Sequence, residues 1–273
     1  MTIPAFNPLL VDPTAPIGVL DSGWGGLSVL KALRQELPLE DFVYCADCAR
    51  APWGDKPSTW IVERCRQICR MLVAQGVKSI VLACNTATAE AADSLRATMS
   101  LPIIGIEPAV KPAAARSKTL SIGVLATTRT IQSARYCSLV ARFANDAVVH
   151  SVAAPGLMEC VERGDFDGPE TMALLHHYLD PLREAGVDKL VLGCTHYPFL
   201  ADAITSIMGD RVELIEPGHA VAAVTRRRLE QNTTLRAANA APSVRFFVSG
   251  AREHSGVLNR LWAGAACVEE LVL

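Results

Sequence analysis

The sequence predicts an α/β fold with two pseudo-symmetric domains, each a mostly parallel sheet flanked by helices, and with the active site in the cleft between them. Short continuous apolar runs alternate with segments of helical length, a pattern typical of parallel strands buried on both faces. Three sequence fragments also recur in the same order at nearly the same spacing. Half of the 273 residues are hydrophobic and 20% are charged, enough to bury one large core or two ordinary ones.

The expected strands are short apolar runs that end in polar or glycine-containing turns. They cover Ile17–Leu20, Phe42–Tyr44, Ser79–Leu82, Ile103–Ile106, Ser121–Leu125, Lys189–Leu192 and Val212–Ile215. Helices are expected between them, over 26–36, 58–75, 86–98, 169–185, 198–207 and 218–231. The stretch 232–243 is polar and alanine-rich and ends in Ala-Pro-Ser. We therefore expect a loop there, followed by a last strand at Val244–Val248.

An internal repeat relates two halves of the chain. One such match could be chance, because apolar strand fragments resemble one another. Three matches in one order imply two homologous α/β units, each with a strand that ends in a cysteine just before a helix. The paired fragments are Ile17–Leu20 with Ile122–Leu125 (offset 105), Gly76–Cys84 with Gly186–Cys194 (offset 110) and Ile106–Pro108 with Ile215–Pro217 (offset 109).

The repeat also sets the expected domain boundaries. The first domain is closed by the C-terminal segment, the second is inserted into it, and a short N-terminal extension precedes both. Their ranges are 12–105 with 218–273, 106–217, and 1–11. Cys84 then falls in the first domain and Cys194 in the second, both at carboxyl ends of parallel strands, where open α/β sheets bind ligands. If the two units face each other, the two thiols confront each other across one cleft.

A cysteine between a strand end and a helix start is suited to acid–base chemistry. The positive end of the helix dipole and free backbone N–H groups favour the thiolate. One thiolate can remove a proton from a carbon acid while a second thiol returns one to the opposite face, which inverts the centre. The alternative is that both cysteines are buried as small hydrophobic residues. Asn85-Thr86 after Cys84 and Thr195-His196 after Cys194 argue for the chemical role.

Four segments resemble the signature segments of the glutamate racemases, in the aspartate/glutamate racemase superfamily, and the likeness runs in order from about Ile17 to the Gly250-Ala-Arg segment. The segments are Ile17-Gly-Val-Leu-Asp-Ser-Gly-Trp-Gly-Gly-Leu-Ser, Tyr44-Cys-Ala-Asp-Cys-Ala-Arg-Ala-Pro-Trp-Gly-Asp-Lys, Ala83-Cys-Asn-Thr-Ala-Thr-Ala and Gly193-Cys-Thr-His-Tyr-Pro. The resemblance implies a cofactor-independent isomerase that interconverts L- and D-glutamate and supplies D-glutamate for bacterial peptidoglycan and so for cell shape.

The resemblance also implies roles for individual residues. Cys84 matches the base that acts on the D-enantiomer and Cys194 the base that acts on the L-enantiomer. The ionisable residues matching those that assist the thiols are Asp21, Asp47, Glu162 and His196. Asp21 is expected to accept a proton or to pair with the substrate ammonium, since a carboxylate beside a thiol raises the thiol's pKa. The alternative role for Asp21 is to cap the following helix or turn. The alternative for Glu162 is a place on a solvated helix face, without a role in the site.

A further set of residues matches the family's substrate-holding groups. Hydroxyls, an amide and backbone N–H groups at helix starts suit a dicarboxylate amino acid. They are Asp21, Ser22, Trp53, Gly54, Asn85, Thr86, Thr195 and His196. The family usually has Pro-Tyr-Gly where this chain has Pro52-Trp53-Gly54. The indole cannot place a phenol oxygen, so the resemblance supports a backbone contact from Gly54 more than a side-chain contact from Trp53.

No metal and no cofactor are expected. The Gly23-Trp-Gly-Gly segment departs from the dinucleotide fingerprint, because Ser28 stands at the last glycine position. A zinc site is the alternative for Cys45, Cys48, Cys65 and Cys69. Cys65 and Cys69 lie four residues apart on an expected amphipathic helix, and this placement disfavours a zinc site. Cys45 and Cys48 flank Asp47 where the family often has Gly and Thr. The remaining cysteines, expected to pack in the core or near the surface, are Cys137, Cys160 and Cys267.

Partners and location follow from charge and cysteine content. The net charge of −2 argues against nucleic acid or a membrane as the main partner. Met1–Pro16 carries no basic segment typical of a secretion signal, so we expect a cytoplasmic protein with its nine cysteines reduced. The family resemblance suggests a homodimer.

Rival functions also have to be considered. They are an aspartate racemase or another two-thiol amino-acid racemase, a single-cysteine decarboxylase, and a gyrase-binding role. The short N-terminal extension disfavours the gyrase-binding role.

Overall fold

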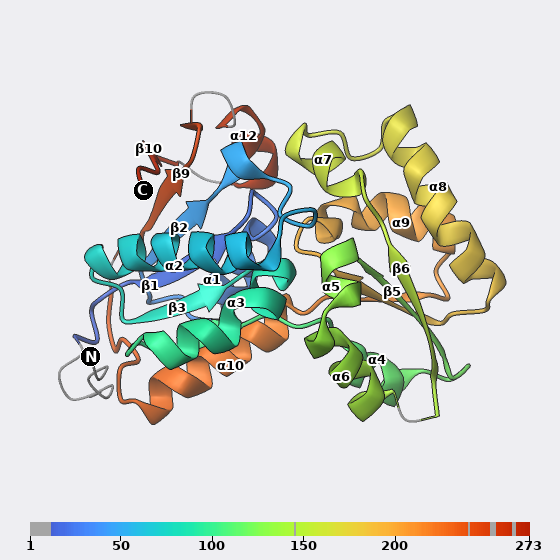
Figure 1. Ribbon diagram of the computed structural model, residues 1–273, viewed down its shortest axis with the longest axis horizontal. Helices are drawn as coiled ribbons and strands as arrows, with labels where there is room; N and C mark the ends of the chain where they lie inside the picture. Colours follow the sequence, from blue (N-terminus) through green and yellow to red (C-terminus); the bar gives the residue numbers. More distant parts are fainter. Residues whose placement is uncertain (1–11, 145, 240, 252–254, 264–265) are drawn as a thin grey trace. The chain divides into compact units, whose positions relative to one another are not determined.

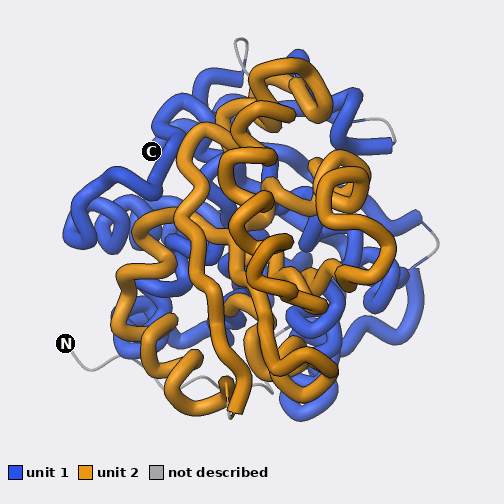
Figure 2. Tube along the Cα trace, turned by 90° about the vertical axis from the view of Figure 1, so that its right-hand side faces the viewer, with its two compact units in different colours: residues 1–106, 218–273 blue, residues 107–217 orange. Residues whose placement is uncertain are grey.

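The computed structural model consists of two compact units (Figure 2), one formed by residues 1–106 with 218–273 and the other by residues 107–217. It describes residues 12–144, 146–239, 241–251, 255–263 and 266–273. The expected N-terminal extension, 1–11, lies outside the described residues. Each unit has its own sheet, and all strand pairs among the described residues are parallel. The predicted α/β class with two parallel sheets flanked by helices is confirmed.

Unit 1 contains a six-stranded sheet in the order β10-β9-β2-β1-β3-β4 (Figure 1). Its central strands are buried along their whole length, which explains their continuous apolar sequence. The strands are β1 (Ile17–Asp21), β2 (Phe42–Ala46), β3 (Ser79–Leu82), β4 (Ile103–Gly105), β9 (Val244–Val248) and β10 (Val268–Glu270).

The helices of unit 1 pack in pairs, α1 against α10 and α2 against α3. Helix α2 is amphipathic: Ile61, Cys65, Ile68 and Leu72 recur at helical spacing and are fully buried. The main helices are α1 (Leu27–Glu36), α2 (Ser58–Ala74), α3 (Asn85–Thr98) and α10 (Gly218–Gln231). The short ones are α12 (Leu258–Leu261) and the 3₁₀ helices η2 (Cys48–Arg50) and η4 (Ser255–Val257).

Unit 2 contains a four-stranded sheet in the order β6-β5-β7-β8. Its strands are β5 (Ser121–Ala126), β6 (Val148–Ala153), β7 (Lys189–Gly193) and β8 (Glu213–Ile215). Helix α4 packs against α6, and α8 against α9. The helices are α4 (Val110–Arg116), α5 (Thr128–Gln132), α6 (Ala134–Phe143), α7 (Leu157–Glu162), α8 (Pro169–Glu184), α9 (Ala201–Met208) and the 3₁₀ helix η3 (Tyr197–Leu200).

The internal repeat is a repeat of structure. The order β2-β1-β3-β4 in unit 1 matches β6-β5-β7-β8 in unit 2. In the first pair of central strands Gly18 pairs with Ile80, and in the second Gly123 pairs with Leu190. These positions differ by 105 and 110 residues, the offsets of the sequence repeat. The two halves therefore share strand order and register.

The last strand of the repeat departs slightly from the sequence match. Ile80 pairs with Ile103 and Leu190 with Leu214, so that 214 minus 103 gives an offset of 111 where the sequence match gave 109. A shift of two residues keeps each side chain on its own face of the sheet. The register of β4 and β8 therefore differs while their buried faces are preserved.

Several elements differ from the sequence expectations. Cys84 directly precedes α3, as predicted, but in unit 2 Thr195 and His196 separate Cys194 from η3, and the helix expected over 198–207 is η3 followed by α9. Residue 106 lies outside β4 and 212 outside β8. Strands β6 and β10 were not predicted, because both are partly exposed and lack a continuous apolar run. Helices α4 to α7 and α12 were also not predicted; each has ten residues or fewer.

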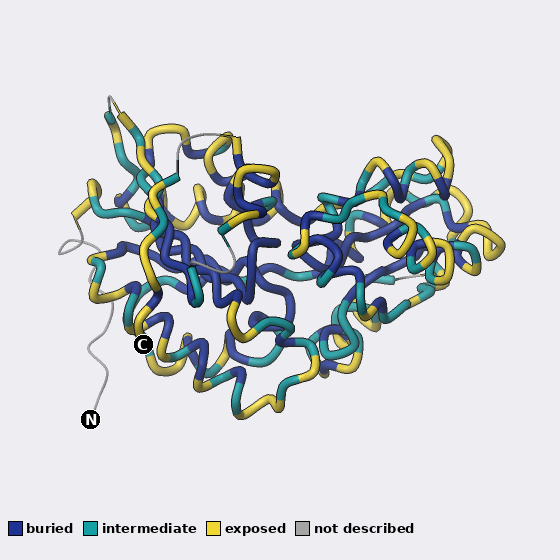
Figure 3. The backbone as a smooth tube through the Cα atoms, turned by 90° about the horizontal axis from the view of Figure 1, so that it is seen from above, coloured by how far each residue is buried: buried dark blue, intermediate teal, exposed yellow. Residues whose placement is uncertain are grey.

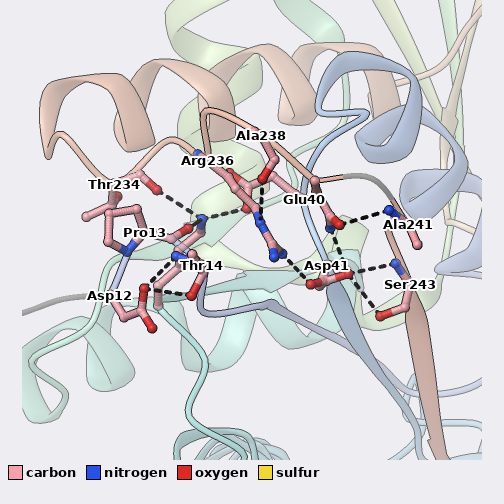
Figure 4. Close-up of polar contacts among 12 residues, drawn as sticks. Asp12, Pro13, Thr14, Glu40, Asp41, Thr234, Arg236, Ala238, Ala241 and Ser243 are labelled. Atoms are coloured by element: carbon pink, nitrogen blue, oxygen red, sulfur yellow. Dashed lines mark hydrogen bonds and ion pairs between the residues drawn. The ribbon is translucent and has the colours of Figure 1, made fainter.

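The predicted loop 232–243, whose described residues (all but 240) form no helix or strand, is held to the rest of unit 1 by a network of polar contacts (Figure 4). The buried ammonium of Lys78 donates to Glu40 at 2.5 Å and to the carbonyl oxygens of Pro13 and Thr234. Asp41 accepts hydrogen bonds from Arg236, Asn239 and Ser243. Lys78 therefore joins three separate chain segments at the amino end of β3.

The central strands are buried, while the strands β6 and β10, the outer helix faces and the loops carry exposed residues (Figure 3). Among the described residues, none of the helices has the length and apolar character needed to cross a membrane.

Candidate active site

In unit 1 the predicted site residues follow the carboxyl ends of three adjacent strands. Asp47 comes after β2, Asp21 and Ser22 lie at the end of β1, and Cys84 follows β3. The order β2-β1-β3 makes these strands neighbours. The backbone N–H of Asp47 donates to the carbonyl oxygen of Asp21 at 3.1 Å. Carboxyl ends of parallel strands are where such sheets bind ligands, and these residues lie at that edge of the sheet.

Cys84 is the N-cap of α3. Its Sγ accepts a hydrogen bond from the backbone N–H of Ala87 at 3.4 Å and lies 3.5 Å from the hydroxyl of Ser22. The residue is 5% exposed. The helix dipole and the N–H donor both favour negative charge on this sulfur. The position suits a thiol that must become a thiolate.

Asp21 is fully buried and supports the start of α1. Its Oδ2 accepts the backbone N–H of Gly26 at 2.7 Å, so the capping contact is present. A Cβ on Gly26 would lie 2.7 Å from the Cβ of Asp21 and 2.9 Å from the hydroxyl of Tyr44. Tyr44 in turn donates to the carbonyl oxygen of Gly23. Only glycine fits at position 26 with Asp21 in this orientation.

Asp47 forms a bidentate ion pair that the sequence did not predict. Nη2 of Arg64 lies 2.6 Å from Oδ1 and Nε lies 2.8 Å from Oδ2. Asp47 is fully buried and Arg64 is 8% exposed. Two parallel charge-assisted hydrogen bonds of this kind fix the carboxylate in orientation. The signal that would have revealed Arg64 is its place in α2 between the buried Ile61 and Ile68.

Two predicted substrate-holding side chains have buried polar atoms with no hydrogen-bond partner among the described residues. Both amide atoms of Asn85, in the first turn of α3, are buried with no hydrogen-bond partner among the described residues, and the same is true of Trp53 Nε1. Thr86, next to Asn85, is also buried. A buried polar atom left unpaired costs about 1–3 kcal/mol. A ligand with carboxylate and ammonium groups would supply partners for the amide.

In unit 2 the predicted residues Cys194, His196 and Glu162 form one chain of contacts. Sγ of Cys194 lies 3.6 Å from Nδ1 of His196, and Nε2 of His196 lies 2.7 Å from Oε1 of Glu162. Cys194 follows β7, and Glu162 is the last residue of α7. Thr195 and His196 are buried. Glu162 is therefore joined to the site rather than lying on a solvated helix face.

The surroundings of His196 favour its charged form. Burial alone lowers the pKa of this imidazole, but the hydrogen bonds and charges of Cys194 and Glu162 outweigh burial and raise the pKa well above its usual value. The charged imidazole of His196 therefore lies between the Glu162 carboxylate and the Cys194 sulfur.

The other seven cysteines lie in different surroundings. Cys45, Cys65 and Cys69 belong to the apolar core of unit 1, and burial raises the pKa of each thiol, that of Cys69 to about 12. Cys137 and Cys267 are exposed. Cys160 is buried, and Cys48 begins η2. Within the described part of the chain, no three His, Cys, Asp or Glu residues are grouped to hold a metal ion.

Comparison with known proteins gives a consistent family. Residues 27–225 match the model of the Asp/Glu/Hydantoin racemase family. The chain is 50% identical over 232 residues to the glutamate racemase of Ralstonia nicotianae, covering 85% of this chain and 83% of that protein. Two solved structures are also similar. The Escherichia coli glutamate racemase, in complex with L-glutamate and the activator UDP-MurNAc-Ala, is 30% identical with a TM-score of 0.83, covering 94% of this chain and 99% of the other.

The second structure is the glutamate racemase of Francisella tularensis in complex with D-glutamate. It is 30% identical with a TM-score of 0.82, covering 95% of this chain and 98% of the other. The structure matches cover nearly the whole sequence, and the family match over residues 27–225 includes both Cys84 and Cys194. The chain therefore belongs to the Asp/Glu/Hydantoin racemase family and, within it, to the glutamate racemases.

Proposed function

We propose that this protein interconverts L- and D-glutamate without a cofactor, by a two-base mechanism that uses Cys84 and Cys194. The observation that carries the proposal is the structural repeat: each sheet has a cysteine directly beyond the equivalent central strand, β3 or β7. Each thiol also has polar neighbours of its own, Ser22 in unit 1 and His196 in unit 2. The glutamate racemases to which the chain is similar support glutamate as the substrate.

With L-glutamate, Cys194 is the proposed base. His196 takes the thiol proton, and its raised pKa makes the resulting imidazolium stable beside Glu162. The Cys194 thiolate then removes the proton from Cα, and the thiol of Cys84 donates its own proton to the opposite face. One C–H bond breaks and one forms, so the product is D-glutamate, with Cys84 now a thiolate.

With D-glutamate, Cys84 is the proposed base. The N–H of Ala87 and the start of α3 stabilise its thiolate. Asp21, buried at the end of β1, accepts the proton of Cys84 or pairs with the substrate ammonium. Asp47 assists as a fixed carboxylate, since Arg64 occupies both of its oxygens. Cys194 then donates the proton to the opposite face.

Substrate holding is assigned to groups near each thiol. The amide of Asn85 and the hydroxyls of Ser22, Thr86 and Thr195 offer donors to the two carboxylates, together with the backbone of Gly54. The Asn85 amide has no other partner among the described residues. The α-carbon of an amino acid is a weak acid, so donors oriented in advance must stabilise the negative charge that develops on proton removal.

The decisive experiment is uptake of solvent deuterium at Cα, started separately from L-glutamate, D-glutamate, L-aspartate and D-aspartate, without added cofactor. We expect uptake and racemisation with both glutamate enantiomers and little with aspartate. Dominant turnover of aspartate would identify an aspartate racemase instead. Loss of a carboxyl group without inversion would identify a decarboxylase.

The individual thiols are tested by replacement. Cys84→Ala and Cys194→Ala should each abolish racemisation in both directions, while Cys137→Ala, at an exposed cysteine, should leave it unchanged. Wild-type turnover by Cys84→Ala would refute the two-base assignment.

The proposal extends to the role in the cell. Racemisation would supply D-glutamate for peptidoglycan synthesis in the cytoplasm, where reducing conditions keep thiols free. All nine cysteines are free thiols, which supports that location. A homodimer rests on the family resemblance and is checked by sedimentation equilibrium. Rescue of a D-glutamate auxotroph by this chain, and failure of rescue by Cys194→Ala, would test the cellular role.

A further inference from the structure

The loop 47–57, which connects β2 to α2, carries Trp53 and Gly54. Two of its residues are held by α2 itself. At the start of the loop, Asp47 forms its bidentate pair with Arg64 of α2. In the middle, the ring of Trp53 packs edge-on against Trp60, with the ring centroids 5.7 Å apart and the planes at 90°. The segment from Asp47 to Trp53, which directly precedes Gly54, is therefore attached to α2 at both of its ends.

Trp60 and Arg64 are four residues apart, so they lie one turn apart on the same side of α2. A third contact reaches the same side: Nζ of Lys56 lies 5.9 Å from the centre of the Trp60 ring. The loop also closes on itself, because the backbone N–H of Lys56 donates to the carbonyl oxygen of Trp53 at 3.1 Å. One face of one helix thus holds the loop at Asp47, Trp53 and Lys56.

The energies of these contacts favour a fixed loop. Asp47 is fully buried, and a buried carboxylate needs a paired cation to remain there. Trp53 is 1% exposed, and an edge-on aromatic pair stabilises the contact beyond the burial of its surface. Trp60 packs against the large ring of Trp53 and supports it.

We propose that Trp60 and Arg64 are positioning residues for glutamate binding, which hold the loop 47–57 so that the backbone of Trp53 and Gly54 meets the substrate. This rests on the proposed function, in which that segment contacts glutamate. Loss of either residue therefore weakens substrate binding, which raises KM. Trp60 acts through the ring of Trp53, so its loss leaves the proton transfers at Cys84 and Cys194 nearly unchanged. Arg64 also fixes Asp47, so its loss slows the proton transfer at Cys84 as well.

The test uses the variants Arg64→Lys, Trp60→Phe and Trp60→Leu. Polarimetry monitors steady-state racemisation from each enantiomer and gives KM and kcat. Arg64→Lys keeps the charge but loses the second hydrogen bond of the fork. Trp60→Phe keeps an aromatic edge and Trp60→Leu does not. Loss of about one hydrogen bond to substrate corresponds to a three- to tenfold increase in KM. We expect that increase for Arg64→Lys and Trp60→Leu and a smaller one for Trp60→Phe, with kcat within about threefold of wild type for the two Trp60 variants.

The matched control is Arg66→Lys, at a partly exposed arginine of the same helix that pairs with Glu63; its KM should equal that of the wild type. A lower melting temperature with unchanged KM would overturn the proposal, because it would show a purely structural role. So would a loss confined to kcat. Trp60→Phe and Trp60→Leu decide the question alone if Arg64→Lys does not fold. Failure of the proposed function is distinct, because the wild type would then not racemise glutamate at all.

Discussion

Nε2 of His196 lies 2.7 Å from Oε1 of Glu162, while Nδ1 of the same ring lies 3.6 Å from the sulfur of Cys194. The imidazole is thus oriented from one side by a carboxylate and faces a thiol on the other. This is the arrangement of an activated nucleophile or base, in which a third group orients the group that takes the proton.

The first prediction concerns Glu162. Glu162→Gln keeps a hydrogen bond to His196 but removes the charge that stabilises the imidazolium, so we expect racemisation to slow by about 10²-fold, the lower range for positioned proton transfer. The measurement is the initial rate with L- and D-glutamate. Glu170→Gln, at an exposed glutamate paired with Arg163, is the control. A Glu162→Gln enzyme with wild-type turnover would contradict the contact's role.

The second prediction concerns pH. The pKa of His196 is raised in the folded state, so its stabilising contribution is fully present below the unfolded value of about 6.5 and is lost as pH rises through the folded value. The difference in unfolding free energy between the wild type and His196→Gln should therefore shrink at alkaline pH. Urea unfolding of both proteins at several pH values measures it. A difference that stays constant up to alkaline pH would refute the assignment.

The third prediction concerns thiol reactivity. Burial raises the pKa of Cys69 to about 12 and also raises those of Cys45 and Cys65. Because the thiolate is the reactive form, these three should resist iodoacetamide in the folded protein, while the exposed Cys137 and Cys267 react. Peptide mapping by mass spectrometry follows each site. All five should react in urea, and rapid labelling of Cys69 without urea would show that its burial is wrong.

The fourth prediction concerns Gly26. A methyl group there would approach Asp21 and Tyr44 to less than 3 Å, so Gly26→Ala should displace the Asp21 carboxylate and reduce activity strongly, with destabilisation of about 1–3 kcal/mol from overpacking. Gly256→Ala is the control, since an added Cβ there would meet nothing within 4 Å. Activity and thermal unfolding are measured together. Full activity in Gly26→Ala would mean that Asp21 tolerates another orientation.

The fifth prediction concerns the buried pair of Lys78 and Glu40. Lys78→Met should destabilise the protein by about 3–5 kcal/mol, because it leaves the Glu40 carboxylate buried without its cation. Removing both charges in Lys78→Met/Glu40→Gln should recover part of that loss. Urea unfolding of the wild type and the single and double variants measures the coupling. Additive effects of the two substitutions would show that the pair does not act as a unit.

The central strands and the repeat were predictable because buried parallel strands impose continuous apolar sequence. The sequence offsets agree with the strand pairing: Gly18 pairs with Ile80, and the residues at the repeat offsets, Gly123 and Leu190, pair in the same way. Strand β6 was not predictable, since it has both exposed and half-buried residues and no regular apolar period. The separation of Cys194 from its helix depends on hydrogen bonds of η3 such as that from Tyr197 N–H to the Cys194 carbonyl oxygen.

Within the site, the sequence identified residues whose position is set by strand ends, and it missed residues that act through distant partners. Asp47 was singled out from its motif, but its partner Arg64 lies 17 residues further on, on a helix where arginine normally faces solvent. Only the fold brings the two together. Trp60 was missed for the same reason, because its contact with the ring of Trp53 exists only in the folded chain.

The repeat has given the chain two cysteines in equivalent places with unequal neighbours, Ser22 beside one and His196 beside the other. The two enantiomers of an amino acid have the same free energy in water, so the equilibrium constant of their interconversion is one. The ratio of kcat to KM must then be the same in both directions, whatever surrounds each thiol. Divergence of the duplicated halves is therefore free to change how tightly each enantiomer binds and how fast it turns over, but only in compensating amounts.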